Sequence, residues 1–407
     1  MGRIGIDVGG SFTDAVLIDA DGGVRVAKVP STPPRIEAGF LDALTVLLAA
    51  AGATPDDVSY LAHGTTVATN AIVTRTLART ALITNEGFRD VLAIGTQMRR
   101  NVYDLWTPEP APLVPRERCH GVRGRIDAQG AEIEPLDEGD VRRAAALMRD
   151  DGTEAVAVMG LFSFLNPTHE RRIGAILAEE LPGVPVTLSA DIVPEFREYP
   201  RAATAAANAA LLPLVGAYIG AVEREVGDLG VRAPLHLMQS NGGVVPAERA
   251  RRTPIALAAS GPAAGVIGGA RLALDAGEPN AITFDMGGTT ADIGIAPGGQ
   301  PELRFDGDAA GTPISLPQID VLCIGAGGGS SAAVDAFGAL AVGPASAGAD
   351  PGPAAYGRGG ERATVTDAHV VLGTLGGARQ LAGGLALDED DPLEAVAAAA
   401  VEVAGAL

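Results

Sequence analysis

The chain has 407 residues, 47% of them hydrophobic, and a net charge of −20, so it is long enough for two or three globular domains and too apolar to be disordered. The negative charge argues against nucleic acid or an anionic membrane as a partner. The two cysteines, Cys119 and Cys323, are too few for a disulfide framework and fit a reducing compartment.

The first residues favour a cytoplasmic protein. Residues 3–8 already predict a strand, and no charged and apolar leader comes before it. No apolar run reaches the roughly 20 residues that a membrane-spanning helix needs. We therefore expect a cytoplasmic protein that makes no membrane contact.

Strands and helices alternate along the first half of the chain. The residue pattern predicts strands at 3–8, 24–30, 58–62, 80–84, 155–162 and 184–188, and helices at 36–51, 136–150 and 170–180. Four prolines between residues 108 and 115 indicate an irregular segment at 96–120. This alternation is typical of an α/β protein.

A second half begins near residue 200. Pro200 and Pro213 bracket an alanine-rich segment, and residues 214–226 follow with an amphipathic helical pattern. The pattern then predicts a strand at 235–238, a helix of small residues at 260–274 and a last helix at 393–407. We place the main boundary near residue 200, which predicts a first domain over 1–200 and a second over 201–407.

Two short segments of the chain share one design. Residues 4–18 read IGIDVGGSFTDAVLI, and residues 282–296 read ITFDMGGTTADIGIA. In the alignment Asp7 matches Asp285, Asp14 matches Asp292, and a Gly-Gly pair follows the first aspartate in both. A single segment of this kind is commonly a tight turn between buried strands. The joint repetition of aspartates, glycines and hydroxyls instead favours a binding function.

A glycine turn of this type can surround a phosphate with backbone N–H groups, because glycine allows close approach and positive φ. An aspartate at the end of the first strand is placed to hold a hydrated Mg²⁺. We therefore predict two related domains that face each other across a nucleotide. In this prediction Asp7 and Asp285 hold the metal and are candidate catalytic residues.

Further motifs follow in a fixed order along the chain: HGTTVATN from residue 63, QSNGG from 239, SGPAAG from 260, IGAGGGS from 324, SAGADPGP from 346 and TDAH from 366. With the two hairpins they resemble the ATP-dependent hydantoinase A and 5-oxoprolinase family, which includes the ATP-using subunit of acetone carboxylase. Eight motifs in one order are more specific than any single glycine-rich loop. The resemblance covers essentially the whole chain. It implies an α/β fold similar to actin and sugar kinases, with two ribonuclease-H-like domains that face a nucleotide cleft.

The resemblance also implies ATP and Mg²⁺ as cofactors and a set of phosphate-contacting residues. These are Gly9, Gly10, Ser11 and Thr13 in the first hairpin, Gly287, Gly288, Thr289 and Thr290 in the second, and Gly327 and Gly328 in the later glycine-rich loop. Ser11 stands where the family usually has Thr, which keeps the hydroxyl group. Such donors, together with a metal ion, neutralise the charge on a phosphoryl group during transfer.

The histidines leave alternatives open. His63 could orient or protonate a substrate carbonyl, which makes it a candidate catalytic residue, or it could bond a loop carbonyl as a structural histidine. For His369 and Asp367 a metal site competes with a helix N-cap at Asp367, and the cap is favoured. Neither the histidines nor the cysteines have zinc-site spacing. Arg99 and Arg100 could reach an anionic substrate, although exposed solvated charges are more common.

Three functions fit the resemblance. The first is ATP-dependent hydrolysis of a small cyclic amide, such as a hydantoin or 5-oxoproline, through phosphorylation of the amide carbonyl. The second is ATP-dependent carboxylation of a ketone, and the third is a nucleotide-binding module that lacks catalysis. The family implies a partner subunit of the hydantoinase-B type, and the oligomeric state stays open.

Family members usually continue downstream with a segment of the type FGGAGP, which resembles an adenosine-binding element. No such segment occurs in residues 1–407. We therefore expect a complete phosphate side and an incomplete adenine side, in a chain that is either a fragment or a shortened homologue.

Overall fold

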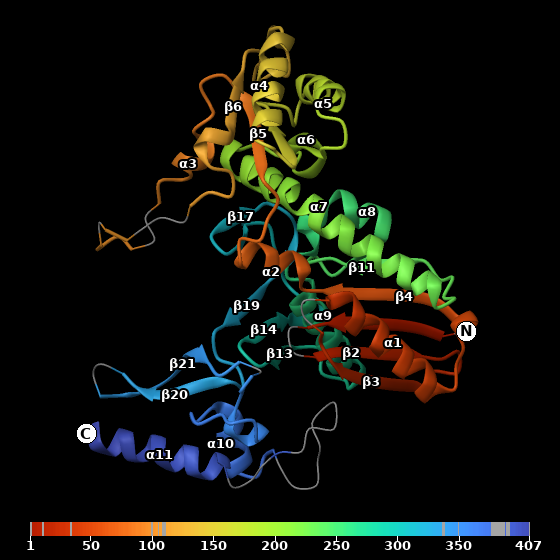
Figure 1. The fold of residues 1–407 in the computed structure, drawn as a ribbon, viewed down its shortest axis with the longest axis vertical. Helices are drawn as coiled ribbons and strands as arrows, with labels where there is room; N and C mark the ends of the chain where they lie inside the picture. The colour runs from red at the N-terminus through yellow and green to blue at the C-terminus, as the bar shows by residue number, and fades with distance from the viewer. Residues whose placement is uncertain are drawn as a thin grey trace.

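The computed structural model of the chain describes residues 2–9, 12–32, 35–98, 101–104, 106–107, 111–335, 338–348, 350–375, 387 and 391–406. The described residues form three sheets of three or more strands, which lie in different parts of the molecule (Figure 1). Four strand pairs complete the sheet structure: β7 (Arg125–Ile126) with β8 (Glu132–Glu134), β15 (Leu303–Arg304) with β18 (Gln318–Ile319), β16 (Gly307–Ala309) with β17 (Thr312–Ile314), and β20 (Ser330–Val334) with β21 (Leu340–Ser346).

The first sheet has the strand order β12-β11-β4-β1-β2-β3. β1, β2 and β3 are antiparallel neighbours, whereas β4 runs parallel to β1 and β11 runs parallel to β4. The strands are β1 (Gly2–Val8), β2 (Phe12–Ile18), β3 (Val24–Pro30), β4 (Val58–Thr65), β11 (Leu235–Met238) and β12 (Val244–Pro246). Because β11 and β12 come after residue 200, the boundary expected there divides the sequence but not this sheet.

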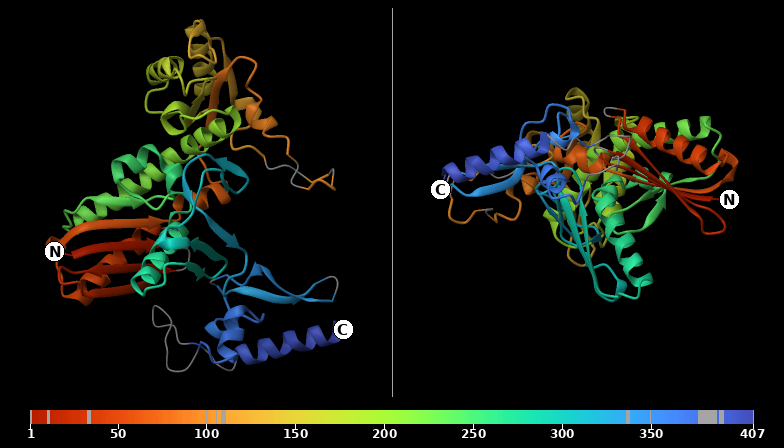
Figure 2. Two further views of the ribbon diagram at one scale, coloured as in Figure 1. Left: turned by 180° about the vertical axis from the view of Figure 1, so that it is seen from behind. Right: turned by 90° about the horizontal axis from the view of Figure 1, so that it is seen from below.

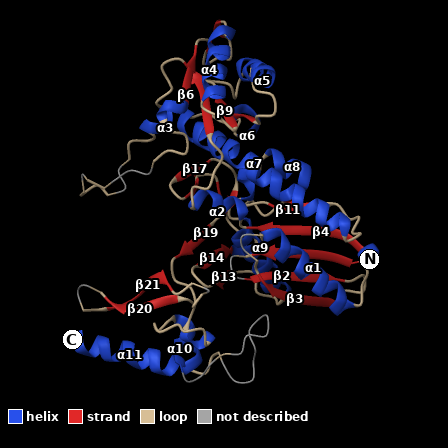
Figure 3. Ribbon diagram, viewed as in Figure 1, coloured by secondary structure: helices blue, strands red, loops and turns tan. Residues whose placement is uncertain are grey.

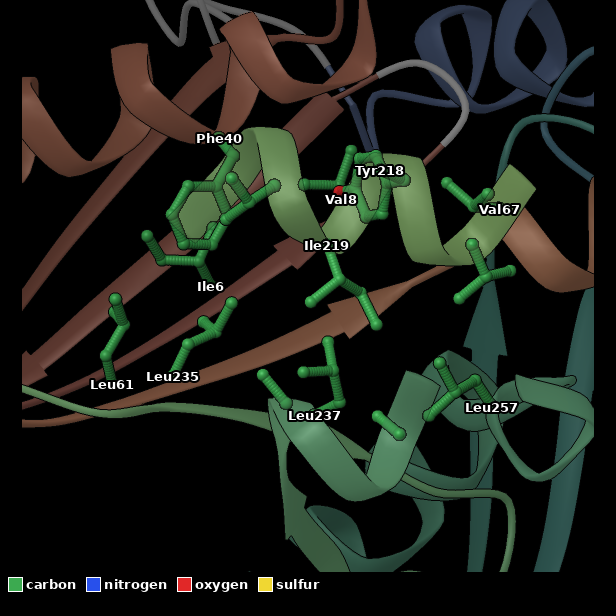
Figure 4. Close-up of a cluster of buried hydrophobic side chains, with 14 of the residues drawn as sticks. Ile6, Val8, Phe40, Leu61, Val67, Tyr218, Ile219, Leu235, Leu237 and Leu257 are labelled. Atoms are coloured by element: carbon green, nitrogen blue, oxygen red, sulfur yellow. The ribbon is translucent and has the colours of Figure 1, made fainter. Parts of the chain in front are cut away.

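One face of the first sheet carries Ile4, Ile6 and Val8 and lies at the centre of the main core. Helices α1 (Ile36–Ala51) and α7 (Glu198–Asp228) cover this face, and Figure 4 shows Phe40 of α1 beside Ile6. Residues of β1 are alternately buried and exposed, as the two-residue period of a strand requires. The packing of this face therefore fixes which side chains, Asp7 among them, the opposite face presents.

The second sheet is parallel throughout and has the order β10-β9-β5-β6. It consists of β5 (Thr80–Asn85), β6 (Cys119–Val122), β9 (Ala155–Met159) and β10 (Val186–Leu188). Every residue of β5 and β9 is buried, which is typical of parallel strands with helices on both faces. α4 (Glu138–Asp150) and α5 (Thr168–Glu180) cover one face and the first half of α7 the other (Figure 3). The predicted α/β class is confirmed.

Helix α7 joins the first two sheets. Its alanine-rich first half packs on the second sheet, and its second half, with Val215 and Ile219, packs on the first. The prediction that a helix starts only at residue 214 was wrong, because α7 continues through Pro213. Proline has a helix-compatible φ, and burial on two sheets offsets the hydrogen bond that it removes. Of the described helices, α7 is the one long and apolar enough to cross a membrane, and 61% of its most apolar window is buried in the protein.

The third sheet, β13-β14-β19, is antiparallel and contains β13 (Ala281–Met286), β14 (Ala291–Ala296) and β19 (Val321–Ile324). Helix α9 (Ser260–Asp275) packs against β13 and β14 and also contacts β4 and β11 of the first sheet. Figures 1 and 2 show α9 between these two sheets. This helix therefore fixes how the two predicted phosphate hairpins lie relative to each other.

The remaining described elements are short or lie near the C-terminus. They are the helices α2 (Val67–Val73), α3 (Val91–Ile94), α6 (Ser189–Ile192), α8 (Ala247–Arg252), α10 (Val365–Val371) and α11 (Asp391–Ala406), and the 3₁₀ turns η1 (Pro55–Asp57), η2 (Arg116–Arg118), η3 (Pro254–Leu257), η4 (Pro297–Gly299) and η5 (Ala354–Tyr356). α11 packs on α10 and β20, at the opposite end of the molecule from the second sheet (Figure 1).

Candidate functional site

The two predicted hairpins have the same backbone geometry. In β1–β2 Asp7 lies directly opposite Asp14, and in β13–β14 Asp285 lies directly opposite Asp292. The first glycine of each turn donates its N–H to the carbonyl three residues later, at 3.0 Å for Gly9 and 2.8 Å in the second hairpin. The repeat seen in the sequence is therefore also a repeat in strand register and turn hydrogen bonding.

The turn residues are exposed in the second hairpin and only partly described in the first. Gly287, Gly288, Thr289 and Thr290 are all exposed. Within the described part of the chain, the backbone N–H groups of Gly288 and Thr289 have no hydrogen-bond acceptor. Two unpaired N–H groups in an exposed glycine turn are suited to an anion. Gly10 and Ser11, predicted to do the same in the first hairpin, lie outside the described residues.

Helix α9 brings the two site aspartates together through a stripe of glycines. A Cβ atom added at Gly261 would lie 3.8 Å from Oδ1 of Asp7, and one added at Gly265 would lie 3.8 Å from Oδ2 of Asp285. These glycines are four residues apart, which is one helical turn or about 6 Å along the axis. One helix turn therefore contacts both aspartates, and the SGPAAG motif supplies the small residues that this contact requires.

The start of α9 is anchored to β4 and α2 by residues of the HGTTVATN motif. The Ala259 N–H donates to Oγ1 of Thr69 at 2.8 Å, and the Ser260 hydroxyl donates to the Thr65 carbonyl at 3.3 Å. Ala259 has a φ of +60°, a left-handed conformation that is uncommon for a residue with a side chain. The surrounding contacts hold this conformation at the residue that directly precedes the helix.

Negative charge accumulates at the point where the hairpins meet. Burial raises the pKa of Asp7 above its ordinary value, and the charges of Asp14 and Asp285 raise it further, while Lys28 lowers it. The two carboxylates face glycines only one turn apart on α9, which places them near each other. A bound cation would relieve this repulsion.

Each hairpin has a different partner for its second aspartate. Lys28 of β3 lies opposite Asp14, and its Nζ is 2.8 Å from both carboxylate oxygens. In the second hairpin Cys323 of β19 lies opposite Asp292 and donates its S–H to the carboxylate. The first hairpin therefore has a cation at the position where the second has a thiol.

His63, a candidate catalytic residue, lies in the core and away from the hairpin turns. Its Nδ1 is 3.2 Å from the Ile6 carbonyl, its Nε2 is 2.7 Å from the Tyr218 hydroxyl, and Phe40 packs against its ring. Burial lowers the pKa of His63 to about 4, which keeps the ring neutral. These contacts support the structural alternative that the sequence left open.

Gly64, the next residue of the same strand, faces the site instead. A Cβ added at Gly64 would lie only 2.6 Å from Oδ1 of Asp7. Because residues alternate across a strand, burial of His63 on the core face turns Gly64 toward Asp7. The HGTT motif thus contributes clearance for a carboxylate, which reasoning from the sequence missed. Strand alternation predicts that His63 and Gly64 point to opposite faces of β4. Which of the two faces the core depends on Tyr218, which is distant in the chain.

Thr13, predicted to contact phosphate, supports the turn from the core side. Its side chain is fully buried and hydrogen bonds to the Ser31 hydroxyl at 3.1 Å, and Ser31 in turn donates to the Gly9 carbonyl at 2.7 Å. The structure therefore does not bring the Thr13 side chain to the exposed face where Asp7 lies. Strand alternation separates the two, because Thr13 lies opposite Val8.

The glycine-rich loop after β19 packs on the second hairpin turn. The N–H groups of Gly328 and Gly329 donate to the carbonyls of Gly287 and Gly288 at 2.8 and 2.7 Å. A Cβ added at Gly327 would lie 2.5 Å from the Thr289 nitrogen, so the close approach requires glycine there. Gly327 and Gly328, predicted to bind cofactor, thus lie beside the turn and fix its backbone.

The TDAH motif has a structural role on the other side of this loop. Thr366 donates both its N–H and its hydroxyl to the Gly328 carbonyl. Asp367 is fully buried and accepts hydrogen bonds from Ala355, across a loop, and from Thr364. The N-cap expected at Asp367 was wrong by three residues, because Thr364 caps α10 and Asp367 completes the capping box.

The sequence predicts that two carboxylates, those of Asp7 and Asp285, hold the metal ion. Within the described ranges no group of three or more His, Cys, Asp or Glu side chains is arranged to hold a metal ion. Mg²⁺ commonly uses only one or two carboxylates, with waters and phosphate oxygens completing its shell. The crowded charge at Asp7 and Asp285 fits such an ion. His369 bonds to Thr374, and Arg99 and Arg100 lie outside the described residues.

The fold and the site together define an α/β protein in which two congruent Asp-Gly-Gly hairpins meet at one glycine-lined helix. Residues 3–181 match the family model of the hydantoinase/oxoprolinase N-terminal region, and residues 201–407 match the hydantoinase/oxoprolinase model. The chain belongs to the hydantoinase/oxoprolinase family, as the motif order predicted.

Individual relatives cover almost the whole chain. It is 38% identical to caprolactamase subunit alpha of Pseudomonas jessenii, over 99% of this chain and 59% of that subunit. It is 36% identical to 5-oxoprolinase 1 of Arabidopsis thaliana, over 78% of this chain and 26% of that protein. The crystal structure of the ATP-dependent caprolactamase from Pseudomonas jessenii superposes with a TM-score of 0.86 at 36% identity, over 99% of this chain and 61% of that one. The nucleotide-free acetone carboxylase structure superposes with a TM-score of 0.81 at 29% identity, over 99% of this chain and 60% of that one. The chain thus spans less than two thirds of these relatives.

Proposed function

We propose that this chain carries the phosphoryl-transfer part of an ATP-dependent enzyme that opens a small cyclic amide. The observation that carries the proposal is the meeting of two congruent hairpins, each with an Asp and a glycine turn, at α9. Two such turns can bind a polyphosphate from both sides through their backbone N–H groups. The caprolactamase and 5-oxoprolinase relatives support a cyclic amide as the second substrate.

An unstrained lactam resists water because its nitrogen lone pair is delocalised into the carbonyl. In the proposed reaction the carbonyl oxygen attacks the γ-phosphorus of ATP, the bond to the bridging oxygen breaks, and ADP leaves with the electron pair. Water then adds to the carbon that bears the phosphorylated oxygen, and the ring C–N bond breaks to free the amine. A second water hydrolyses the resulting acyl phosphate to the carboxylate and inorganic phosphate. One lactam, one ATP and two waters give one amino acid, ADP and phosphate.

The residues of the chain have separate tasks in this proposal. Asp7 and Asp285 would hold Mg²⁺, which supplies positive charge to the polyphosphate. Gly288 and Thr289 offer backbone N–H groups to phosphate oxygens, and Lys28 adds a positive side chain near Asp7. Preorganised donors of this kind stabilise charge that develops in the transition state.

The wider architecture also belongs to the proposal. The strand order of the first sheet, with three antiparallel strands followed by the parallel β4 and β11, supports the ribonuclease-H-like, actin-like arrangement expected from the resemblance. The caprolactamase relative is named as a subunit, which supports a partner subunit, for which we propose the hydantoinase-B type. The third sheet repeats the first hairpin without its parallel strands among the residues described.

Ketone carboxylation is the second candidate function. The TM-score of 0.81 to acetone carboxylase favours it, because the whole chain superposes on a protein with that activity. The chemistry of the two reactions is related. ATP would phosphorylate an enolate oxygen in the carboxylation and an amide oxygen in the hydrolysis. Bicarbonate would then supply the carboxyl group.

The deciding experiment measures ADP release from Mg·ATP with the chain alone and with its co-expressed partner subunit. Each preparation is assayed with 5-oxoproline, hydantoin, caprolactam, or acetone plus bicarbonate. ADP release that requires a cyclic amide and matches the amino acid formed supports the proposal. Release that requires ketone and bicarbonate supports the carboxylase. ATP binding without substrate-dependent release in both preparations leaves the nucleotide-binding module as the function.

A further inference from the structure

One face of the third sheet is apolar and uncovered. α9 packs on the face that carries Asp285, where a Cβ added at Gly294 would lie 2.3 Å from Val266. The opposite face, which we call the open face, presents six exposed apolar side chains: Ile282, Phe284, Met286, Ile295, Leu322 and Ile324.

Strand register shows that these side chains belong to one surface. Ile282 lies opposite Ile295 across β13 and β14, and Ile293 lies opposite both Phe284 and Leu322. Residues directly opposite each other in a sheet point to the same face. The exposed fractions of Ile282, Phe284 and Leu322 are 73%, 58% and 61%. A contiguous apolar surface of this kind marks an interaction site, whereas scattered apolar residues need no explanation.

The first hairpin shows what covers the equivalent surface. In the alignment of the two hairpins, Ile4, Ile6 and Val8 match Ile282, Phe284 and Met286. The first three have exposed fractions of only 1%, 2% and 1%. They are buried because α1 and α7 pack on that face with Phe40, Leu44 and Ile219 among their core residues. The same strand design thus has a helical layer in one copy and none in the other.

We propose that the open face is the docking surface for a helical layer equivalent to α1 and α7, supplied by polypeptide outside residues 1–407. The inference rests on the repeat and does not depend on the proposed function. The face has apolar side chains in all three strands, which suits the apolar stripe of an amphipathic helix. Polypeptide is available for this role in the relatives, because the chain spans only 59% of caprolactamase subunit alpha.

The test uses the part of the Pseudomonas jessenii caprolactamase subunit alpha that lies outside its match to this chain. That part is co-expressed, with an affinity tag, with the 407-residue chain, so that the two can fold together. We expect the untagged chain to co-purify at equal stoichiometry. The Phe284→Ser and Leu322→Ser variants should reduce recovery at least tenfold. Val26→Ser is the matched control, because Val26 is an apolar strand residue with an exposed fraction of 71% on the first sheet, and it should keep full recovery.

Two further measurements separate docking from misfolding and from self-association. The melting temperatures of the Phe284→Ser and Leu322→Ser chains should match the wild type, since both side chains are exposed, and both variants should bind less of the apolar dye bis-ANS. Light scattering on the 407-residue chain should give a monomer. The proposal is overturned by wild-type chain that does not co-purify, by equal recovery in the variants, or by a dimer that Phe284→Ser dissociates, which would identify a second copy as the occupant.

Discussion

The clearance that Gly64 gives to Asp7 is the most direct test of the site. Replacing Gly64 with Ala adds one methyl group at a point 2.6 Å from Oδ1 of Asp7. Carbon and oxygen atoms in ordinary contact are roughly 3.5 Å apart, so the carboxylate has to move by about 1 Å. The backbone has little reason to move, because Gly64 is paired within β4 between β1 and β11.

The expected result is a loss of turnover without a loss of stability. A misplacement of about 1 Å in a catalytic group commonly costs around 100-fold in rate, and we expect that loss in Mg·ATP turnover. Alanine is favoured over glycine in a strand interior by roughly 0.5–1 kcal/mol, so the melting temperature should stay equal or rise slightly.

The assay compares two glycine variants of adjacent strands. Gly5→Ala is the control, because Gly5 lies on the same face of β1 as Asp7 and a Cβ added there has nothing within 4 Å. ADP release by the chain with its partner subunit is measured for wild type and both variants, together with thermal unfolding of the chain. Turnover in Gly64→Ala within twofold of Gly5→Ala would refute the placement of Asp7 at the reacting phosphates.

Three further outcomes follow from the site. Asp7→Asn and Asp285→Asn should each lower Mg·ATP turnover by at least 100-fold while the melting temperature is kept, and near-normal ADP release in both would contradict the two-hairpin site. His63 has a folded pKa of about 4 against 6.5 in the unfolded chain, so the unfolded state takes up its proton first. Stability should therefore be full above pH 6.5 and fall by up to about 3 kcal/mol toward pH 4, and urea unfolding should show a shallower pH dependence in His63→Gln. The chain alone should bind ATP weakly in calorimetric titration, and micromolar affinity with preference for adenine would place the base site within residues 1–407.

The hairpins could be predicted from the sequence because everything that defines them is local. Each copy is a segment of fifteen residues that contains alternating apolar residues, a Gly-Gly turn and the two matched aspartates. The register of Asp7 with Asp14, and of Asp285 with Asp292, then follows from the turn itself. Helix α1 was also predicted with its observed bounds, since its apolar period and Gly52 at its end are local signals.

The roles of His63 and of α7 depend on parts of the chain that are far apart in the sequence. His63 is turned to the core by a hydrogen bond to Tyr218, and nothing near residue 63 indicates that partner. Helix α7 continues through Pro213 because two separate sheets cover it, and burial outweighs local propensity. The first sheet likewise takes β11 from beyond residue 200, a pairing that no local pattern specifies.

Several glycines around the second hairpin act through the space that they leave. Added Cβ atoms at Gly269 and Gly294 would lie within 2.5 Å of side chains, and one at Gly327 would lie 2.5 Å from the Thr289 nitrogen, so α9 and the glycine-rich loop pack closely on the second hairpin. The glycine-rich motifs therefore position two carboxylates and two turns without adding charge of their own. A glycine-rich motif indicates where two parts of the chain pack closely. Only the three-dimensional contacts show which side chain or backbone group occupies the space beside each glycine.

The two hairpins are alike in backbone and different in charge, and this difference has a chemical consequence. Lys28 bonds both oxygens of Asp14 and lowers the pKa of Asp7, so the first hairpin keeps a cation next to its site aspartate. At the matching position of the second hairpin, burial and the neighbouring Asp292 raise the pKa of the Cys323 thiol to about 12, so this group stays neutral. In the proposed complex Lys28 compensates the charge of Asp14, whereas the thiol of Cys323 adds no positive charge beside Asp292, so a polyphosphate held by both turns would meet less negative charge at the first hairpin. The proposed phosphoryl transfer needs most compensation where charge develops between the leaving and the transferred groups, and we expect the hairpin with Lys28 to supply more of it.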